Sequence, residues 1–274
     1  MSVADGLASL LFVPGSRPDR FGKALASGAD AVCIDLEDGV ADAAKAQARA
    51  AALEFLAGRP PRLCLRINGL RTRTGLQDLV ELASSGHHPE LLLVPKVESA
   101  ADIEIVSAVA GTSCIVPLIE TPRGLAAAAG IAAHPAVCAM MFGGGDLAAE
   151  LGVRVEWDAL RTARGLFILG CAQAGKPAID VPYLALDDPA GLAAEAKAAK
   201  ALGFTAKAAI HPAQIAPIHA VLRPTAAEVA EALEAQRAFE AAGGGAIRFN
   251  GRLLDEPIMR GYRRVLAKQR NQHA

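Results

Sequence analysis

The chain reads AVCIDLE at residues 31–37, an apolar run that ends in charged residues. Seven other short runs, rich in Val, Ile, Leu, Phe or Cys, resemble it. The eight runs span residues 10–15, 31–37, 63–68, 91–96, 114–120, 137–143, 178–183 and 206–211. None alternates apolar and polar residues as a half-exposed strand does, and strands buried on both faces of a parallel sheet have this pattern. We therefore predict eight parallel strands.

Alanine-rich segments separate these runs and carry helix-start signals. Ser99 with Asp102 resembles a capping box, and Thr121-Pro122, Asp188-Pro189 and His211-Pro212 place proline where a first helical turn tolerates it. A strand followed by a helix recurs along the whole chain. This alternation favours an α/β fold of the closed (β/α)8 TIM-barrel type over an open doubly wound sheet.

Composition excludes several classes of protein. A chain of 274 residues with 52% hydrophobic and 21% charged residues has enough apolar material for a large core and is not disordered. With 28 basic against 29 acidic residues it lacks the positive field that nucleic-acid binding needs. No apolar run is long enough for a membrane span, and the segment before Pro14 lacks the basic start of a signal peptide. We expect a cytoplasmic protein with neither nucleic acid nor a membrane as partner.

The chain divides into a barrel at residues 1–223 and an extension at residues 224–274. The extension begins with a helical segment, passes through Gly243-Gly244-Gly245 and contains Asn250-Gly251, a hairpin signal. A last amphipathic helix opens near Pro257. Because so short a piece cannot bury a core of its own, we expect a lid, joined through the flexible glycines, that packs on its own barrel or on a neighbouring subunit.

Charged residues gather at the carboxyl ends of the predicted strands, where barrel enzymes carry their active sites. They are Arg17, Asp35, Glu37, Asp38, Arg66, Asn68, Lys96, Glu120, Asp146, Lys207 and His211, with Asn68 as the one member that cannot ionise. Burying such charges costs free energy unless they are paired or bind a ligand. Salt bridges between neighbouring strands are the structural alternative to a site.

Glu120 and Asp146 follow adjacent strands, and two neighbouring carboxylates repel each other unless a cation lies between them. Oxygen ligands without nearby His or Cys favour Mg²⁺. Alternatively, Asp146 caps the helix that follows it. Gly145, in the triplet 143–145, offers a backbone amide to a substrate.

Two further strand-end residues have alternative roles. Arg66 suits a substrate carboxylate because its guanidinium binds through two nitrogens, but a structural pair with Asp35 or Glu37 is equally simple. His211, directly before Pro212, suits a helix cap or a buried hydrogen bond better than a general base. No Ser stands in a motif with supporting His and Asp, which argues against nucleophilic acyl transfer.

Seven motifs together resemble the citrate lyase β-subunit-like branch of the HpcH/HpaI aldolase superfamily. In order they are LFVPGSRPDR at 11–20, GADAVCIDLEDGV at 28–40, LRING at 65–69, VPKVE at 94–98, IET at 119–121, FGGGDL at 142–147 and AIHPAQI at 209–215. The resemblance spans almost the whole chain. It implies a (β/α)8 barrel, Mg²⁺, and the cleavage or formation of a carbon–carbon bond beside a coenzyme A thioester.

The resemblance also implies roles for individual residues. Glu120 and Asp146 match the family's Mg²⁺ ligands, and Arg66 matches the residue that faces the substrate's carboxylate and oxo group. Five further positions match the stretches that receive the coenzyme A or acyl-carrier arm: Phe12, Arg17, Lys23, Ile210 and His211. Asp255 resembles an acid on a C-terminal segment that closes over a neighbouring subunit's site, within a trimer.

These assignments predict a Mg²⁺-dependent lyase that cleaves a 3-hydroxyacyl-CoA of the malyl-CoA or citramalyl-CoA type into an acyl-CoA and a 2-oxo acid. Asp255 would exchange a proton with the acyl methyl carbon, unless it only caps the last helix. One alternative is a citrate lyase β subunit that acts on a citryl thioester of an acyl carrier protein. The other is a barrel scaffold without catalysis.

Overall fold

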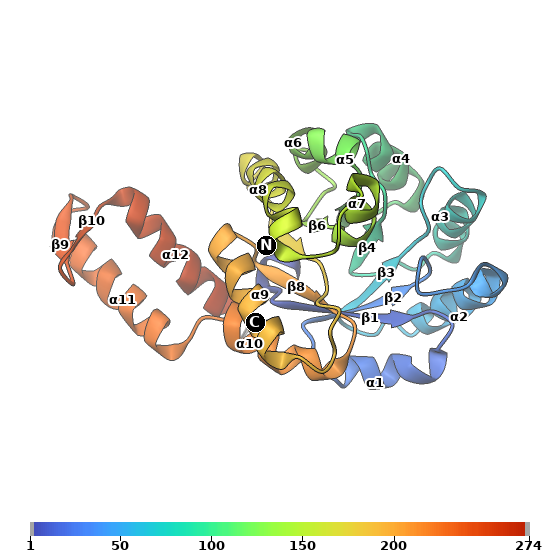
Figure 1. Cartoon of the computed structure of the whole chain (residues 1–274), viewed down its shortest axis with the longest axis horizontal. Helices are drawn as coiled ribbons and strands as arrows, with labels where there is room; N and C mark the ends of the chain where they lie inside the picture. The colour runs from blue at the N-terminus through green and yellow to red at the C-terminus, as the bar shows by residue number, and fades with distance from the viewer. Residues whose placement is uncertain (1–2, 272–274) are drawn as a thin grey trace.

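The computed structural model describes residues 3–271 and contains a closed barrel of eight parallel strands in sequence order, which confirms the predicted fold (Figure 1). The strands are β1 (Ser9–Pro14), β2 (Ala31–Asp35), β3 (Leu63–Arg66), β4 (Leu91–Val94), β5 (Ile115–Ile119), β6 (Met140–Phe142), β7 (Ala178–Asp180) and β8 (Ala206–Ala209). The barrel closes where β1 pairs with β8, with Ser9 opposite Lys207.

Helices surround the barrel and follow the strands. The α-helices are α1 (Phe21–Leu25), α2 (Lys45–Ala57), α3 (Arg73–Ser85), α4 (Ala100–Ala110), α5 (Pro122–Ala126), α6 (Ala128–Ala132), α7 (Gly144–Leu151), α8 (Trp157–Gln173), α9 (Pro189–Leu202) and α10 (Ile215–Leu222). Short 3₁₀ turns are η1 (Val3–Gly6), η2 (Pro18–Arg20), η3 (Asp42–Ala44) and η4 (Pro212–Gln214). The predicted capping box of Ser99 and Asp102 starts α4, and Thr121 and Asp188 cap α5 and α9.

Each strand ends earlier than its apolar run in the sequence. In the second run, β2 ends at Asp35, so Glu37 lies two residues beyond the strand. In the sixth run, residues 137–143, the strand β6 begins only at Met140 and ends at Phe142. The residues past each strand leave the ladder and turn toward the helices, and their side chains therefore lie at the carboxyl rim of the barrel, where a ligand can reach them.

Two apolar clusters form the barrel's core. One fills the layer between strands and helices, and the other fills the barrel interior with side chains such as Leu10, Cys33, Leu91 and Met141. The interior is a packed core and not a pore, as expected for a barrel of eight strands. Within residues 3–271, no helix is long and apolar enough to cross a membrane.

A buried ionic cluster joins the last two barrel strands to their helices. Asp180 and Lys207 are fully buried, and the Lys207 ammonium lies 2.7 Å from both Asp180 Oδ2 and Glu195 Oε1. Arg164 Nε donates to Asp180 Oδ1 over 2.9 Å. Asp180 thus neutralises two buried cations. Lys207 was a strand-end candidate for chemistry, but it forms buried salt bridges, which were the structural alternative.

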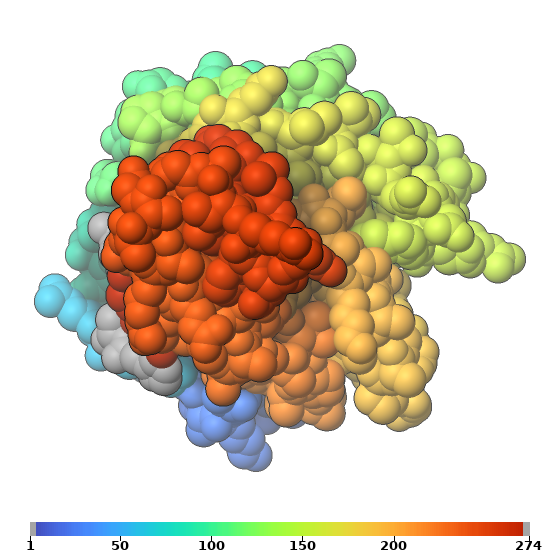
Figure 2. All heavy atoms as spheres, turned by 90° about the vertical axis from the view of Figure 1, so that its left-hand side faces the viewer, coloured from blue at the N-terminus to red at the C-terminus, as the bar shows by residue number. Residues whose placement is uncertain are grey.

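The C-terminal residues form an arm that stands out from the barrel (Figures 1 and 2). Its elements are α11 (Ala226–Ala241), β9 (Ile247–Phe249), β10 (Arg252–Leu254) and α12 (Glu256–Asn271). The predicted hairpin is confirmed, with Asn250 and Gly251 both at positive φ in its turn. At its base, α12 contacts η1, and Lys268 Nζ donates to Thr205 O.

Two expectations about the arm are wrong. The arm buries a small core of its own, made of Ala235, Phe239, Leu254 and Met259. The glycines 243–245 do not join it to the barrel: Gly243 and Gly244 lie at the far end of α11, where their N–H groups close the helix on Glu240 O and Phe239 O. They end a helix, as glycine often does, and the connection to the barrel is the short segment between α10 and α11.

Asp180→Asn is expected to lower the free energy of unfolding by about 3–5 kcal/mol, because it leaves Arg164 and Lys207 buried without their shared carboxylate. Denaturant unfolding measures the change. Asp188→Asn is the matched control: it is exposed, and asparagine caps a helix as well as aspartate does. A loss below about 1 kcal/mol for Asp180→Asn would contradict the role given to this cluster.

Candidate active site

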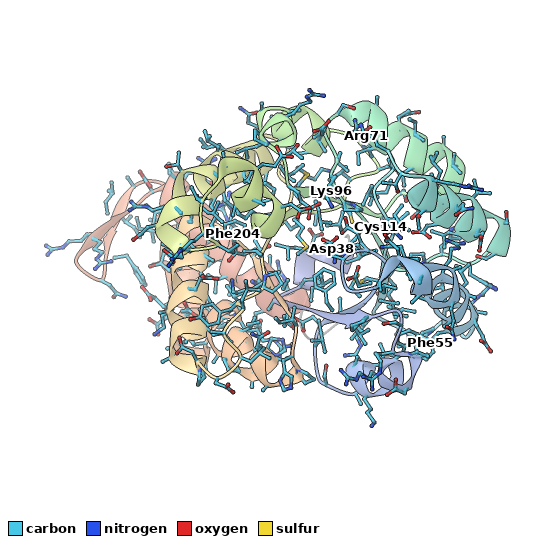
Figure 3. All side chains as sticks on the ribbon, turned by 45° about the vertical axis from the view of Figure 1, so that its right-hand side comes forward. Asp38, Phe55, Arg71, Lys96, Cys114 and Phe204 are labelled. Carbon is cyan, nitrogen blue, oxygen red and sulfur yellow. The ribbon has the colours of Figure 1, made fainter. Side chains whose placement is uncertain are left out.

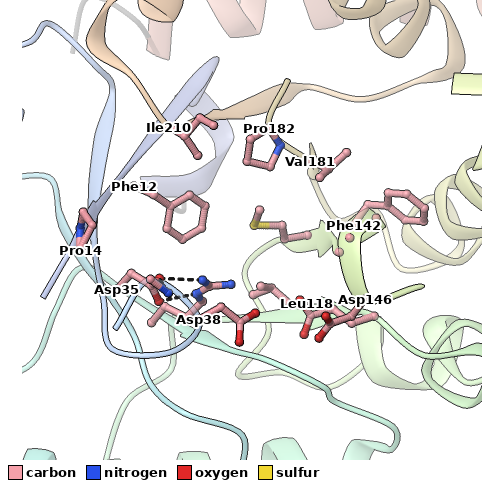
Figure 4. A pocket seen from close by; sticks show the side chains of 17 residues that line it. Phe12, Pro14, Asp35, Asp38, Leu118, Phe142, Asp146, Val181, Pro182 and Ile210 are labelled. Atoms are coloured by element: carbon pink, nitrogen blue, oxygen red, sulfur yellow. Dashed lines mark hydrogen bonds and ion pairs between the residues drawn. The ribbon is translucent and has the colours of Figure 1, made fainter. Parts of the chain in front are cut away.

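A cavity of about 410 Å³ opens at the carboxyl ends of the strands (Figure 4). Acidic side chains line one side of it, and Phe12, Val181, Pro182 and Ile210 lie across from them. Residues at or near the carboxyl ends of all the barrel strands except β4 line the cavity. An apolar wall facing charged groups suits a ligand with an apolar part and an anionic part.

Asp35 and Arg66 form a buried ion pair at the cavity. Arg66 Nε and Nη2 donate to the two carboxylate oxygens of Asp35 over 2.6 and 2.8 Å, an arrangement that the neighbouring register of β2 and β3 permits. Burial acts to raise the pKa of Asp35, but the hydrogen bonds and positive charge of Arg66, together with the N–H groups of Glu37 and Gly39, outweigh it and lower that pKa. The guanidinium also lies over the Phe12 ring, 4.9 Å from its centroid, so Arg66 is held rigidly.

Glu37 continues the ion pairs from Arg66 to Lys96. Glu37 Oε2 lies 3.0 Å from Arg66 Nη1, and Glu37 Oε1 accepts a hydrogen bond from Lys96 Nζ over 2.9 Å. Lys96 Nζ also lies 2.8 Å from Asp146 Oδ2. The side chains of five residues on different strands and loops are therefore linked from Asp35 to Asp146.

Glu120 is a buried acid of the cavity. It is 4% exposed, and its Oε2 accepts a hydrogen bond from the backbone N–H of Lys96 over 2.8 Å. A Cβ at position 143 would lie 2.0 Å from Glu120 Cγ, so glycine is required there. Burial, aided by the negative charge of Glu37, raises the pKa of Glu120 to about 7. A cation near its free oxygen would stabilise the ionised form.

Negative charge exceeds positive charge at this rim. The carboxylates are Asp35, Glu37, Asp38, Glu120 and Asp146, and the cations in contact with them are Arg66 and Lys96. Among the described residues no group of three or more His, Cys, Asp or Glu forms a metal cage. Two carboxylates with water or substrate oxygens are, however, a common Mg²⁺ environment, and the residues present fit this ion.

The predicted ligand-contacting residues divide into two groups. Arg66, Glu120, Gly145 and Asp146 line the cavity together with Phe12 and Ile210. Arg17, Lys23 and His211 do not line it and are exposed, on the segments after β1 and β8. Because β1 and β8 are neighbours, these segments belong to one side of the rim.

The alternatives left open by the sequence have different outcomes. Gly143 is the N-cap of α7 and no side chain caps this helix, so Asp146 does not serve as its cap. Arg66 makes the structural pairs and also lines the cavity. His211 is a cap: its Nδ1 accepts from the N–H of Ala213 at the start of η4.

Asp255 lies on the arm and is absent from the lining of its own chain's cavity. Its Oδ1 accepts a weak hydrogen bond from Ile258 N over 3.2 Å, as a cap of α12 would. The base of the arm contacts the amino-terminal end of the barrel, near Thr205, whereas the cavity opens at the carboxyl end. The base of the arm and the cavity therefore lie at opposite ends of the barrel strands.

Two residues of the site received no role from the sequence. Asp38 is exposed and lines the cavity beside Gly39. Lys96 contacts the site by both its backbone and its side chain. Both were visible as charges at strand ends, and the DLEDG and VPKVE motifs contain them. Their roles were not visible because these depend on contacts between loops.

Glu120→Gln is expected to raise the free energy of unfolding at pH 8 without divalent ions, by about 2–4 kcal/mol. The pKa of Glu120 rises from 4.5 to about 7 on folding, so the folded protein binds this proton more tightly. Ionisation therefore costs stability above pH 4.5, fully so above pH 7. Denaturant unfolding at pH 8 and pH 4 measures the gain, which should vanish at pH 4. A Gln variant less stable than wild type at pH 8 would contradict it.

Curated relatives match nearly the whole chain. A (3S)-malyl-CoA thioesterase from Cereibacter sphaeroides is 37% identical over 268 residues, covering 95% of this chain and 93% of the relative. An L-malyl-CoA/beta-methylmalyl-CoA lyase from the same species is 35% identical over 288 residues, covering 89% of each.

A solved structure agrees with the fold and its family. The structure of CitE from Mycobacterium tuberculosis in complex with magnesium, acetoacetate and coenzyme A has a TM-score of 0.82 at 33% identity, covering 99% of this chain and 100% of that one. The HpcH/HpaI aldolase/citrate lyase family matches residues 8–212. These residues include every strand of the barrel and every residue that lines the cavity. The chain belongs to the HpcH/HpaI aldolase/citrate lyase family.

Proposed function

We propose that this chain is a Mg²⁺-dependent carbon–carbon lyase that cleaves a 3-hydroxyacyl-CoA of the malyl-CoA or citramalyl-CoA type into an acyl-CoA and a 2-oxo acid. The observation that carries the proposal is the meeting of Glu120 and Asp146 with Arg66 in one cavity. The malyl-CoA lyase among the relatives and the magnesium and coenzyme A in the CitE structure support it.

Glu120 and Asp146 would hold the ion, each through the oxygen that Lys96 does not contact. When bound, Mg²⁺ supplies a Lewis acid for the carboxylate and hydroxyl oxygens of the substrate. Gly145 lies in the first turn of α7, where backbone N–H groups have no partner within the helix. These N–H groups suit the substrate carboxylate.

Arg66 would stabilise the oxygen at which the oxo group forms. Asp35 fixes its guanidinium through two hydrogen bonds, so positive charge is already oriented toward the cavity before the substrate arrives. In cleavage a base takes the hydroxyl proton, the bond between the carbinol carbon and the α-carbon of the acyl group breaks, and the electron pair of that bond moves into the thioester as an enolate. The α-carbon of the enolate then receives a proton from an acid.

We assign that proton to Asp255 of a neighbouring copy, because its own chain does not bring it to the cavity. The assembly would be a homotrimer in the cytoplasm. Exposed apolar side chains on the outer helices, Leu76 and Val80 of α3 and Leu166 and Leu169 of α8, support contact between copies. The arm, residues 224–274, would be the lid and residues 1–223 the catalytic barrel.

The coenzyme A arm would enter beside β1 and β8. Phe12 and Ile210 line the cavity on this side, and Arg17, Lys23 and His211 are exposed near it. Arg17 is paired with Asp19, 2.9 Å away, and would exchange this exposed partner for a phosphate. Exposed cations beside an apolar wall suit a ligand with a phosphorylated end and an apolar arm.

Hydrolysis of the same thioester is a second candidate, favoured by the relative named as a malyl-CoA thioesterase. The products separate the two activities. A lyase converts malyl-CoA into acetyl-CoA and glyoxylate, whereas a thioesterase adds water and yields malate and free coenzyme A.

Purified protein with Mg²⁺ and malyl-CoA or citramalyl-CoA is expected to release acetyl-CoA and a 2-oxo acid, detected by liquid chromatography. Glu120→Gln and Asp146→Asn should each abolish this release, because one carboxylate is too few to hold the ion. Free coenzyme A with malate as the main products would replace the lyase with the thioesterase. Activity with citryl thioesters alone would favour the citrate lyase alternative, and no turnover of any of these would favour the scaffold.

Asp255→Ala is expected to lose at least about 100-fold in turnover, the usual contribution of a general acid, while Mg²⁺ binding persists. Mixing it with Glu120→Gln protomers under conditions of subunit exchange should restore part of the activity, because some sites then combine an intact barrel with an intact arm. Mixtures of verified hetero-oligomers that remain inactive would exclude action between subunits. A fully active Asp255→Ala enzyme would exclude the residue from the mechanism.

A further inference from the structure

Lys96 contacts one proposed metal ligand through its backbone and the other through its side chain. Its backbone N–H donates to Glu120 Oε2, and its ammonium pairs with Asp146 Oδ2, each over 2.8 Å. Glu120 Oε1 and Asp146 Oδ1 make no hydrogen bond or ion pair within the described residues. One residue thus holds one oxygen of each carboxylate and leaves the other available.

The backbone conformation of Lys96 is unusual and makes this double contact possible. Its φ is +54°, in the left-handed region that side-chain-bearing residues seldom adopt. The residue follows β4 (Leu91–Val94) after Pro95, and Arg71 Nη1 donates to its carbonyl over 3.3 Å. Disfavoured backbone conformations that persist at a site point to a functional constraint.

The ammonium of Lys96 is itself held in place. Besides Asp146 it pairs with Glu37 Oε1, and Glu37 is buried and paired with Arg66 on its other oxygen. Lys96 lies toward the middle of the barrel (Figure 3). The position of Asp146, on the first turn of a separate helix, is thereby tied through Lys96 to the rigid pair of Arg66 and Asp35.

We propose that Lys96 is the positioning residue of the metal site, setting the separation and orientation of Glu120 and Asp146 so that one oxygen of each faces the ion. This inference rests on the proposed Mg²⁺ site. Residues that orient metal ligands in this way typically change metal affinity by roughly 10–100-fold when they are replaced.

Positioning and charge predict opposite effects for the loss of the ammonium. If Lys96 acted only through its charge, removing a positive group beside the site would tighten the binding of a divalent cation. If it positions the ligands, removing it frees Asp146 and weakens binding. The sign of the change therefore decides between the two roles.

The test is Mn²⁺ titration of the full-length protein, with free Mn²⁺ measured by electron paramagnetic resonance. Lys96→Met and Lys96→Gln are expected to weaken binding by roughly 10–100-fold, and Lys96→Arg, which keeps the charge, should recover part of it. Thermal unfolding confirms that each variant is folded. Lys200→Met is the control, since Lys200 is similarly exposed at 40% and ion-paired, but to Glu228; its Mn²⁺ affinity should equal wild type.

The outcomes separate this inference from the proposed function. Wild-type protein that binds no Mn²⁺, or Glu120→Gln protein that binds it as well as wild type, would overturn the metal site itself. Wild type that binds normally, together with Lys96→Met and Lys96→Gln proteins that bind as tightly or more tightly, would overturn the role of Lys96 alone.

Discussion

The site depends on a chain of ion pairs that runs from Asp35 through Arg66, Glu37 and Lys96 to Asp146. Each cation lies between two carboxylates, so removing any member leaves a neighbouring charge at the rim with one partner fewer. The chain crosses from β2 and β3 to the loop after β4 and the first turn of α7. It converts separate strand ends into one fixed arrangement of charges.

The barrel supplies the rigidity that this chain needs. Parallel register places Asp35 directly opposite Arg66, and the packed apolar interior beneath them leaves little freedom for the strands. The glycine at position 143 allows Glu120 to lie close against the backbone of the next strand end. An excess of carboxylates can then persist at the rim, in a position where it attracts a divalent cation instead of unfolding the barrel.

The fold could be identified from the sequence because eight short apolar runs alternate with segments that carry helix-start signals. Glu120, Asp146 and Arg66 could be identified as candidates because they lie at the ends of such runs or follow them. The conformation of Lys96 could not be predicted, since it depends on hydrogen bonds from Arg71 and to Glu120 across separate loops. The order of the apolar runs showed which strands are neighbours. Which charged side chains pair with one another depends on the register between those strands, and the sequence does not give that register.

The arm shows the same limit in another form. Its elements followed from local signals such as Asn250-Gly251, whose positive φ values the turn requires. Its flexibility was inferred from glycine composition, yet Gly243 and Gly244 end a helix through specific hydrogen bonds. The glycine composition predicted where the helix is interrupted. It did not predict that the arm has a core, because that core depends on how Phe239 packs against its neighbours.

The central claim is that the carboxylates held by Lys96 bind a divalent cation. Anomalous diffraction from crystals grown with Mn²⁺ tests it most directly, because manganese replaces magnesium at oxygen sites and is located without reference to activity. The account predicts one strong anomalous peak in the cavity, bonded to both Glu120 and Asp146. At saturating Mn²⁺, a cavity without such a peak, or a peak bonded to neither carboxylate, would contradict it.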